Sequence, residues 1–283
     1  MQNKACSVSR CCKYGYTVNR KRERIAPLFR GRRRGKNKMI KVKFCGLRRV
    51  EDIEAVNRLQ PDYAGFVFAR SRRQVTAEQV AAFRKLLNKE VKTVAVLVNM
   101  PVEEAASLAN AGLADLLQLH GDESAAYTAK LKTLTEAKII KAIRLQPEQE
   151  NAVRSNAKVP QCNVRLFERG SEHETARQTN RNLLAQARLV DYYLFDTFAP
   201  DVYGGTGKTL SLSLLKGLPI DKPFFLAGGL DAGNVAAIIR EVQADEKLRT
   251  NFYGVDVSGG IETEGVKDAA KMEAFMKVMH REK

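Results

Sequence analysis

Three glycine-rich turns in the second half of the chain have the composition of phosphate-binding loops. They are 203–209 (YGGTGKT), 227–229 (AGG) and 258–260 (SGG). Glycine lets the backbone approach an anion closely, so that successive N–H groups can surround it. One such turn is usually only a turn, but three together predict a phosphate site. A nucleotide-binding P-loop is excluded, because the residue five places before Gly207 is Val202 and not glycine.

Two side chains that could transfer protons, Cys45 and Asp196, each stand at the end of a strand-like run. A lone cysteine is as often a small buried apolar residue as a catalyst. Its thiol becomes a useful base when nearby cations or helix N-termini lower its pKa, conditions that we expect beside a phosphate site. Asp196 follows an apolar run (YLF), so its carboxylate needs solvent or a partner; capping a loop N–H is the alternative.

Short runs rich in β-branched and aromatic residues predict the strands that position these groups. They cover 40–45, 62–68, 92–98, 114–119, 138–144, 191–197, 223–228 and 252–257, and a candidate helix follows each. This alternation is typical of a parallel sheet with crossover helices. A doubly wound sheet commonly has about five or six strands, whereas eight units in roughly 245 residues match a closed barrel. We therefore expect an α/β fold, a (β/α)8 TIM barrel, with its chemistry where the strands end.

Local signals also mark the connections between the strands. Helix starts are expected at Thr76 with Glu78, at Pro101 with Glu103 and Glu104, and at Asp122 with Glu123. The stretch 146–190 is polar and contains Pro147, Pro160 and Gly170, which makes the fifth crossover unusually long. We interpret it as an insertion, more often a surface excursion than a lid, since long surface loops cost little free energy.

The first 38 residues differ from the rest of the chain in charge. They hold 13 of the 48 Lys and Arg and one of the 32 Asp and Glu, so they carry +12 of the net charge of +16. Their apolar residues have no sustained period, which predicts a disordered basic extension (1–38) before a barrel domain (39–283). The weakly charged remainder is typical of an enzyme, so we expect a solvated tail and no specific nucleic acid partner. An organellar transit peptide and a natural start at Met39 are the alternatives.

Composition narrows the class of protein further. With 44% hydrophobic residues the chain can form a full core. Its apolar runs are far shorter than the roughly 20 residues of a membrane-spanning helix, and no secretory signal is recognisable, so we expect no membrane partner. Five cysteines are too few for a disulfide scaffold, and their odd number leaves one thiol free, which favours a cytoplasmic protein.

Taken in order, these residues resemble the phosphoribosylanthranilate isomerase family, (β/α)8 enzymes of tryptophan biosynthesis. The resemblance runs from about Met39 to the C-terminus and does not include the basic extension. The segments that carry it are 43–47 (KFCGL), 65–68 (GFVF), 98–99 (VN), 118–121 (QLHG), 196–197 (DT), 204–208 (GGTGK) and 256–260 (DVSGG). This combination looks like that family and not like its barrel relatives.

The resemblance carries the family's site residues over to this sequence. It implies that Cys45 is the general base, Asp196 the general acid and Arg73 the group that holds the carboxylate of anthranilate. The family usually has a proline and an Arg-Tyr pair in the loop of Arg73. That loop is one residue shorter here, so Arg70 and Arg72 remain alternatives.

The resemblance further implies that the backbone of two late turns holds the substrate phosphate and that a third loop closes over it. The phosphate-binding residues are Gly228, Gly229, Ser258, Gly259 and Gly260, and the mobile loop contains Gly204, Gly205, Gly207 and Lys208. The family usually has two serines before the glycine after the eighth strand, and here the second is Gly259.

The implied reaction is an Amadori rearrangement, an aldose–ketose isomerisation that needs no cofactor and no metal. Its substrate would be the phosphosugar N-(5-phosphoribosyl)anthranilate and its product 1-(2-carboxyphenylamino)-1-deoxyribulose 5-phosphate. Protonated Asp196 would open the furanose ring, and the Cys45 thiolate would take the proton from the sugar carbon beside the iminium. These roles require a raised pKa for the acid and a lowered pKa for the thiol.

Other phosphosugar-binding barrels are the alternatives among enzymes. An indole-glycerol-phosphate synthase would have an active site built on lysine and glutamate. A ribulose-phosphate epimerase would have a metal site with histidines. The chain has three histidines, His120, His173 and His280, and two of them lie outside the expected strand ends, which argues against a metal site. We assign His120 an orienting role rather than a catalytic one. A monomer and a homodimer are both compatible with the sequence.

Overall fold

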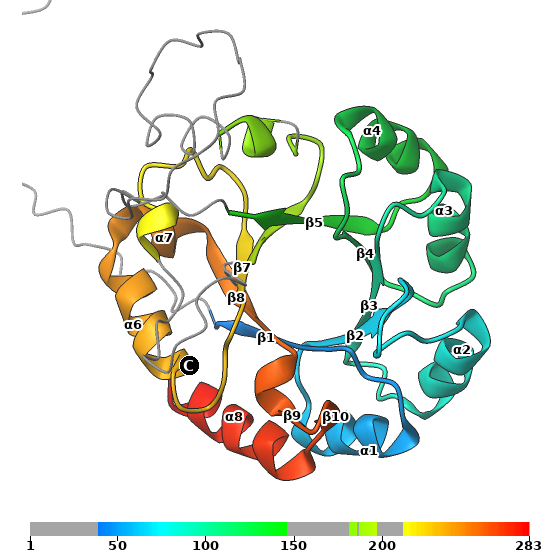
Figure 1. Cartoon of the computed structure of the whole chain (residues 1–283), viewed down its shortest axis with the longest axis horizontal. Helices are drawn as coiled ribbons and strands as arrows, with labels where there is room; N and C mark the ends of the chain where they lie inside the picture. The colour runs from blue at the N-terminus through cyan, green and yellow to red at the C-terminus, as the bar shows by residue number, and fades with distance from the viewer. Residues whose placement is uncertain (1–38, 146–180, 186, 197–211, 283) are drawn as a thin grey trace, which may run out of the picture. The chain divides into compact units, whose positions relative to one another are not determined.

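The computed structural model describes residues 39–145, 181–185, 187–196 and 212–282 (Figure 1). Three of the predictions above fall outside these residues: the basic extension 1–38, the loop 204–208 and most of the 146–190 insertion. Within the described part of the insertion, residues 181–185 are helical. The predicted strands fall within the described ranges except for residue 197 at the end of the sixth, so they are tested directly.

Parallel strands close into a barrel around a central axis (Figure 1). They are β1 (Lys41–Cys45), β2 (Tyr63–Val67), β3 (Lys92–Leu97), β4 (Leu116–Leu119), β5 (Lys138–Arg144), β6 (Tyr192–Asp196), β7 (Phe224–Ala227) and β8 (Phe252–Val257). Each strand pairs with the next, and β8 closes the barrel by pairing with β1, with Lys43 opposite Asp256. The TIM barrel is confirmed, and every strand lies within its predicted range.

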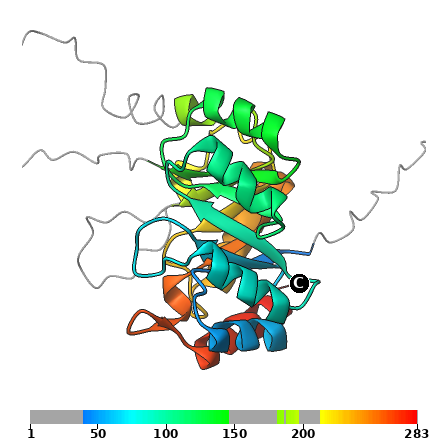
Figure 2. The same ribbon diagram turned by 90° about the vertical axis from the view of Figure 1, so that its right-hand side faces the viewer.

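Helices surround the barrel on its outer side, as Figure 2 shows from a second direction. They are α1 (Val50–Leu59), α2 (Ala77–Leu86), α3 (Val102–Asn110), α4 (Ala125–Leu134), α6 (Val235–Ala244), α7 (Glu246–Asn251) and α8 (Ala269–Arg281). After β8 the chain forms a 3-10 turn, η2 (Gly259–Ile261), and a small hairpin of β9 (Glu262–Thr263) and β10 (Val266–Lys267). A second 3-10 turn, η1 (Leu212–Leu214), precedes β7. None of the helices in the described ranges has the length and apolarity needed to span a membrane.

Two of the predicted helix starts are confirmed. Thr76 caps α2, with its hydroxyl accepting from Gln79 N at 3.3 Å and the Gln79 side chain accepting from Thr76 N at 2.8 Å. The reciprocal partner is therefore Gln79 three residues on, while Glu78 adds negative charge to the first turn and also interacts with the Thr76 side chain. Pro101 directly precedes α3, where its missing N–H costs no hydrogen bond.

The predicted start of α4 at Asp122 and Glu123 is wrong. Ser124 caps this helix and accepts from Tyr127 N at 3.2 Å. Glu123 instead turns into the fold, where its carboxylate accepts from Gly121 N and pairs with Lys141 of β5 at 2.7 Å. Burial opposes its charge, but Lys141 and the backbone donors lower the pKa of Glu123. The ion pair with Lys141 thus places Glu123 in the interior, although the local sequence pattern predicts it at the start of the helix.

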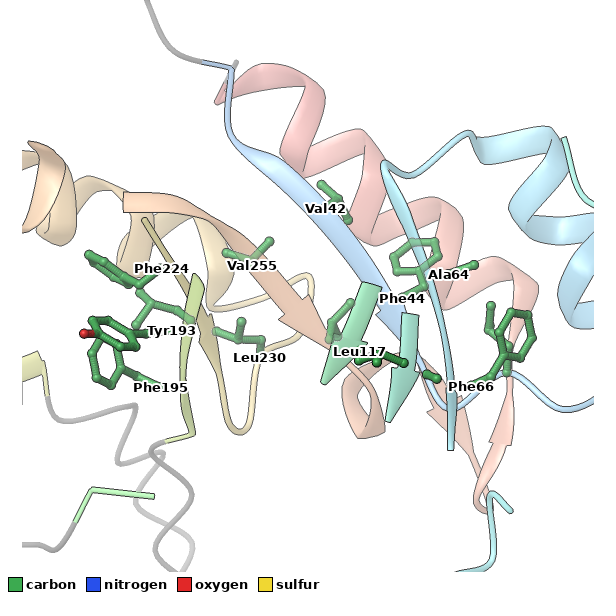
Figure 3. Close-up of a cluster of buried hydrophobic side chains, with 14 of the residues drawn as sticks. Val42, Phe44, Ala64, Phe66, Leu117, Tyr193, Phe195, Phe224, Leu230 and Val255 are labelled. Atoms are coloured by element: carbon green, nitrogen blue, oxygen red, sulfur yellow. The ribbon is translucent and has the colours of Figure 1, made fainter. Parts of the chain in front are cut away.

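Alternation along the strands divides the core into an outer and an inner layer. Val42 and Phe44 of β1 belong to the outer layer between strands and helices (Figure 3). Phe44 packs edge-on against Phe275 of α8, with ring centroids 6.1 Å apart. The inner cluster consists of Tyr63, Val94, Leu116, Ile140, Ala142, Leu194, Phe225 and Ala227. Because successive side chains point to opposite faces of a strand, Lys43 and Cys45 face the inside of the barrel.

Candidate active site

The predicted proton-transfer groups lie at the same end of the barrel. Cys45 is the last residue of β1 and Asp196 the last residue of β6. Gly228 directly follows β7, and Ser258 directly follows β8. Because all strands of the barrel run parallel, their carboxyl ends form one mouth.

Cys45 is a buried free thiol with 8% of its surface exposed. Its backbone oxygen accepts from Ser258 Oγ at 3.0 Å, which ties the end of β1 to the turn after β8. Burial raises the pKa of the Cys45 thiol and nearby Asp256 adds to that rise, while Lys43 and Lys267 oppose it. The expectation of a lowered thiol pKa is wrong for this structure, because desolvation and the carboxylate outweigh the two cations.

A buried ion pair lies beside the thiol inside the barrel. Lys43 Nζ donates to both carboxylate oxygens of Asp256, at 2.9 and 3.0 Å. The Lys43 side chain is fully buried and that of Asp256 is 7% exposed. Burial works against the ammonium form, but Asp256 and Cys45 more than offset it, and the pKa of Lys43 is raised.

Asp196 lies next to His120, which follows β4. Nε2 of His120 is 3.7 Å from Asp196 Oδ2, and about a quarter of each side chain is exposed, 22% and 25%. On the other side of the ring, Nδ1 of His120 is 2.9 Å from Nε2 of Gln118. If that amide donates to Nδ1, the ring proton is on Nε2 and faces Asp196. This position suits the orienting role assigned to His120.

Arg73, in the loop after β2, is held by a carboxylate from the hairpin after β8. Its Nε and Nη2 donate to the two oxygens of Glu262 at 2.6 and 2.7 Å. Lys267 contacts the same carboxylate at 2.7 Å, and Arg72 at 3.2 Å. Burial opposes the charge of Glu262, but Arg73 and Lys267 lower its pKa to about 2. Glu262 therefore stays ionised and fixes the Arg73 side chain at the mouth.

Among the three candidate arginines, Arg73 is the most enclosed. It is 24% exposed, whereas Arg72 is 64% exposed and Arg70 also lies on the surface. Its side chain crosses Gly46, where φ is +81° and a Cβ atom would collide with Arg73 Cδ. The residue after Cys45 must therefore be glycine for both its conformation and its space.

The two described glycine turns need glycine for different reasons, backbone conformation after β7 and close packing after β8. Gly228 and Gly229 have φ values of +97° and +63°, a region that favours glycine. The side-chain amide of Asn234 donates to Gly229 O at 2.8 Å and fixes this turn before α6. After β8, Gly260 packs so closely on Leu230 O that a Cβ atom would collide. The turns after β7 and β8 are thus in contact with each other.

The family was identified by comparison with known proteins. A family model described as N-(5'phosphoribosyl)anthranilate (PRA) isomerase matches residues 42–172 and 171–278. The chain belongs to this family. The N-(5'-phosphoribosyl)anthranilate isomerase of Thermoanaerobacter sp. (strain X514) is 42% identical over 84% of this chain and 97% of the relative. That of Endomicrobium trichonymphae is 34% identical over 85% of this chain and 98% of the relative.

Solved structures agree with this assignment. The phosphoribosyl anthranilate isomerase of Thermotoga maritima superimposes with a TM-score of 0.62 at 28% identity, covering 86% of this chain and all of the other. The TrpF structure from Jonesia denitrificans gives a TM-score of 0.60 at 27% identity, covering 85% of this chain and 97% of the other. The resemblance of this chain to the phosphoribosylanthranilate isomerase family is therefore confirmed.

Several charged groups at the mouth were not predicted from the sequence as site residues. Lys43 and Asp256 stand inside the segments KFCGL and DVSGG, but their charges received no role. Glu262 and Lys267 lie beyond those segments. One feature of the sequence could have identified Lys43: it is a charged residue two positions before Cys45, and therefore on the same inward face of the strand. In the described parts of the chain, no group of three His, Cys, Asp or Glu side chains is placed to hold a metal ion.

Proposed function

We propose that this chain is an N-(5'-phosphoribosyl)anthranilate isomerase that converts its substrate to 1-(2-carboxyphenylamino)-1-deoxyribulose 5-phosphate. The observation that carries the proposal is the mouth itself, where a thiol ending β1 and a carboxylate ending β6 stand at the same end as two glycine turns. A general acid and a general base at the ends of two strands around one opening suit an internal proton-transfer reaction. The 42% identity to a relative of that name supports the substrate.

In this proposal the two glycine turns hold the phosphate of the substrate. Gly228 and Gly229 follow β7, and Ser258, Gly259 and Gly260 follow β8, the two strands whose loops commonly bind phosphate in TIM barrels. Gly229 and Gly259 are exposed, which leaves these turns open to an anion. The loop 204–208 lies outside the described residues, so its closing over the substrate stays a prediction.

Arg73 would bind the carboxylate of the anthranilate ring. Glu262 occupies Nε and one Nη2 donor, so the Nη1 edge of the guanidinium is the edge that a second carboxylate would approach. The side chain passes over Gly46, directly after Cys45, which brings this contact next to the proposed base. Arg72 and Arg70 support the role less well because they are exposed.

Asp196 and Cys45 would act in sequence. Protonated Asp196 donates to the furanose ring oxygen as the C1–O bond breaks, and the nitrogen lone pair forms the iminium. The Cys45 thiolate then removes the proton from C2, and the electron pair of that C–H bond forms the enolamine, which tautomerises to the ketone. Asp196 ends as a carboxylate and Cys45 as a thiol, so the net charge of the site is unchanged. Loss of the thiol proton to solvent and uptake of one proton from solvent by Asp196 then restore the starting state and complete the turnover.

The test is the decay of anthranilate-type fluorescence after the protein is added to freshly made N-(5'-phosphoribosyl)anthranilate. We expect rapid loss of signal without release of free anthranilate, and no comparable loss with Cys45→Ser. Decay no faster than the breakdown of the substrate alone would refute the proposed activity. Equal decay with the Cys45→Ser variant would refute the assignment of the base.

A further inference from the structure

The buried pair of Lys43 and Asp256 is energetically unusual for the inside of a barrel. Desolvating two charges costs several kcal/mol, and apolar side chains of similar volume are often at least as stable in the same place. The two residues lie directly opposite each other in the ladder between β1 and β8. Stability alone therefore gives no reason for a charged pair at this position.

The pair is adjacent to the proposed base. Lys43 and Cys45 are two residues apart on β1 and so share its inner face. A Cβ atom at Gly65 would lie 3.0 Å from Cys45 Sγ and 3.2 Å from Lys43 Cε, so both side chains converge on the space that this glycine leaves. The ammonium group has three N–H donors. Asp256 accepts two hydrogen bonds from it, and the Cys45 side chain is a further hydrogen-bonding partner. The third donor is the one that can serve the sulfur.

The groups around Cys45 act on the thiol with opposite signs. Lys43 from β1 and Lys267 from β10 favour the thiolate, whereas Asp256 from β8 disfavours it. Arg73 also interacts with the thiol, and its charge is paired with Glu262 of β9. Lys43 is the cation that shares the strand and the inner face of Cys45. Its charge is therefore placed to decide how readily the sulfur ionises.

We propose that Lys43 is a positioning residue for Cys45: held in place by Asp256, its ammonium group donates to the thiolate that forms when Cys45 acts as base. This inference rests on the proposed role of Cys45. Asp256 keeps the lysine charged and fixes its direction. The pair is buried at a cost in stability because it holds one hydrogen-bond donor at the sulfur inside the barrel.

The experiment measures the rate of iodoacetamide alkylation of Cys45 between pH 7 and pH 10, by mass spectrometry of the peptide that contains it. Site-resolved detection separates Cys45 from the other four cysteines. Alkylation follows the thiolate fraction. Loss of a neighbouring cation lowers that fraction by at least about tenfold while the pH is below the pKa of the thiol, so we expect Lys43→Met to slow alkylation by that factor. Lys43→Arg, which keeps the charge, is expected to stay within about threefold of the wild-type rate.

Lys141→Met is the matched control. Lys141 also faces a buried carboxylate, Glu123, at 2.7 Å, but it lies on β5. Its loss leaves a lone charge just as Lys43→Met does, and we expect the alkylation rate of Cys45 to stay within about threefold of wild type. Equal slowing by both variants, or no slowing by Lys43→Met, would overturn the proposal. If Lys43→Met does not fold, the double variant Lys43→Met, Asp256→Asn is compared with Asp256→Asn alone, so that both proteins lack the carboxylate that disfavours the thiolate. Slower alkylation of the double variant supports the proposal, and equal rates overturn it.

Turnover gives a second readout. A positioning residue does not touch the substrate, so Lys43→Met should lower kcat at least about tenfold while KM stays within about threefold, and Lys43→Arg should restore kcat. An effect confined to KM would overturn the proposal. The alkylation rates need no substrate, so they remain decisive if the wild-type protein shows no isomerase activity, an outcome that would refute the proposed function alone.

Discussion

The two ends of the barrel bury polar groups in different ways. Where the strands end, Lys43, Asp256, Glu262 and Lys267 are buried as charges around the Cys45 thiol. Where the strands begin, three tyrosines pack together inside the barrel, and two of them, Tyr63 and Tyr253, hydrogen-bond through their hydroxyls.

The tyrosine end is formed by Tyr63, Tyr192 and Tyr253, packed on Phe225 of β7. The hydroxyls of Tyr63 and Tyr253 are 2.7 Å apart. The rings of Tyr192 and Tyr253 have centroids 5.0 Å apart, and Tyr63 packs edge-on against Phe225 at 5.6 Å. Burial raises the pKa of Tyr63, so its hydroxyl stays uncharged at neutral pH. The comparison indicates that one end provides stability and the other end provides reactive groups.

The largest effect is expected when the aspartate at the end of β6 is replaced, and the aspartate just before β6 provides the comparison. We expect Asp196→Asn to lower kcat by at least about 100-fold, because the amide cannot donate the ring-opening proton. Asp191, just before the same strand, accepts from Ile139 N at 2.9 Å and contacts Lys132 at 3.2 Å. Asp191→Asn is the control and should leave kcat within about threefold. Steady-state fluorescence assays give both values, and equal losses would remove the distinction between the ends.

A second prediction separates the two arginines that share Glu262. Arg73→Gln should raise KM by about 10- to 100-fold, the effect of losing a charge-assisted carboxylate contact worth roughly 1.5–3 kcal/mol. Arg72→Gln removes a contact to the same glutamate but should change KM by less than about threefold. Substrate titrations at fixed enzyme concentration measure both. A larger effect at Arg72 would transfer the carboxylate role to that residue.

These groups differ in how far the sequence could predict them. The strands follow from short local runs of β-branched and aromatic residues, and Cys45 and Asp196 follow because a strand end is a local feature. The Lys43–Asp256 bond joins residues 213 positions apart, and it exists only because β8 pairs with β1 to close the barrel. The sign of the Cys45 pKa shift likewise depends on burial, which no local pattern contains.

A smaller effect is expected in the pH dependence of stability. Folding lowers the pKa of Glu262 from an ordinary value of 4.5 to about 2. Its ionised form thus stabilises the fold above pH 4.5, and this contribution is lost as the pH falls toward 2. We expect a loss of about 1–2 kcal/mol between pH 6 and pH 3, after allowance for solvent screening. Urea unfolding of the wild type and of Glu262→Gln at both pH values isolates this carboxylate from the others. An equal fall in the free energy of unfolding of the two proteins between pH 6 and pH 3 would contradict the assignment.

The smallest effect tests the tyrosine end. Tyr63→Phe removes one of the two hydroxyls that bond to each other, while the ring keeps its edge-on contact with Phe225. We expect the free energy of unfolding in urea to fall by about 1 kcal/mol, the usual net value of a buried hydrogen bond. Because Tyr63 begins β2 and the proposed acid and base end β6 and β1, kcat and KM should stay within about twofold of wild type. A tenfold fall in kcat would mean that the tyrosines influence the mouth through the barrel interior, and stability and chemistry would then no longer divide between its two ends.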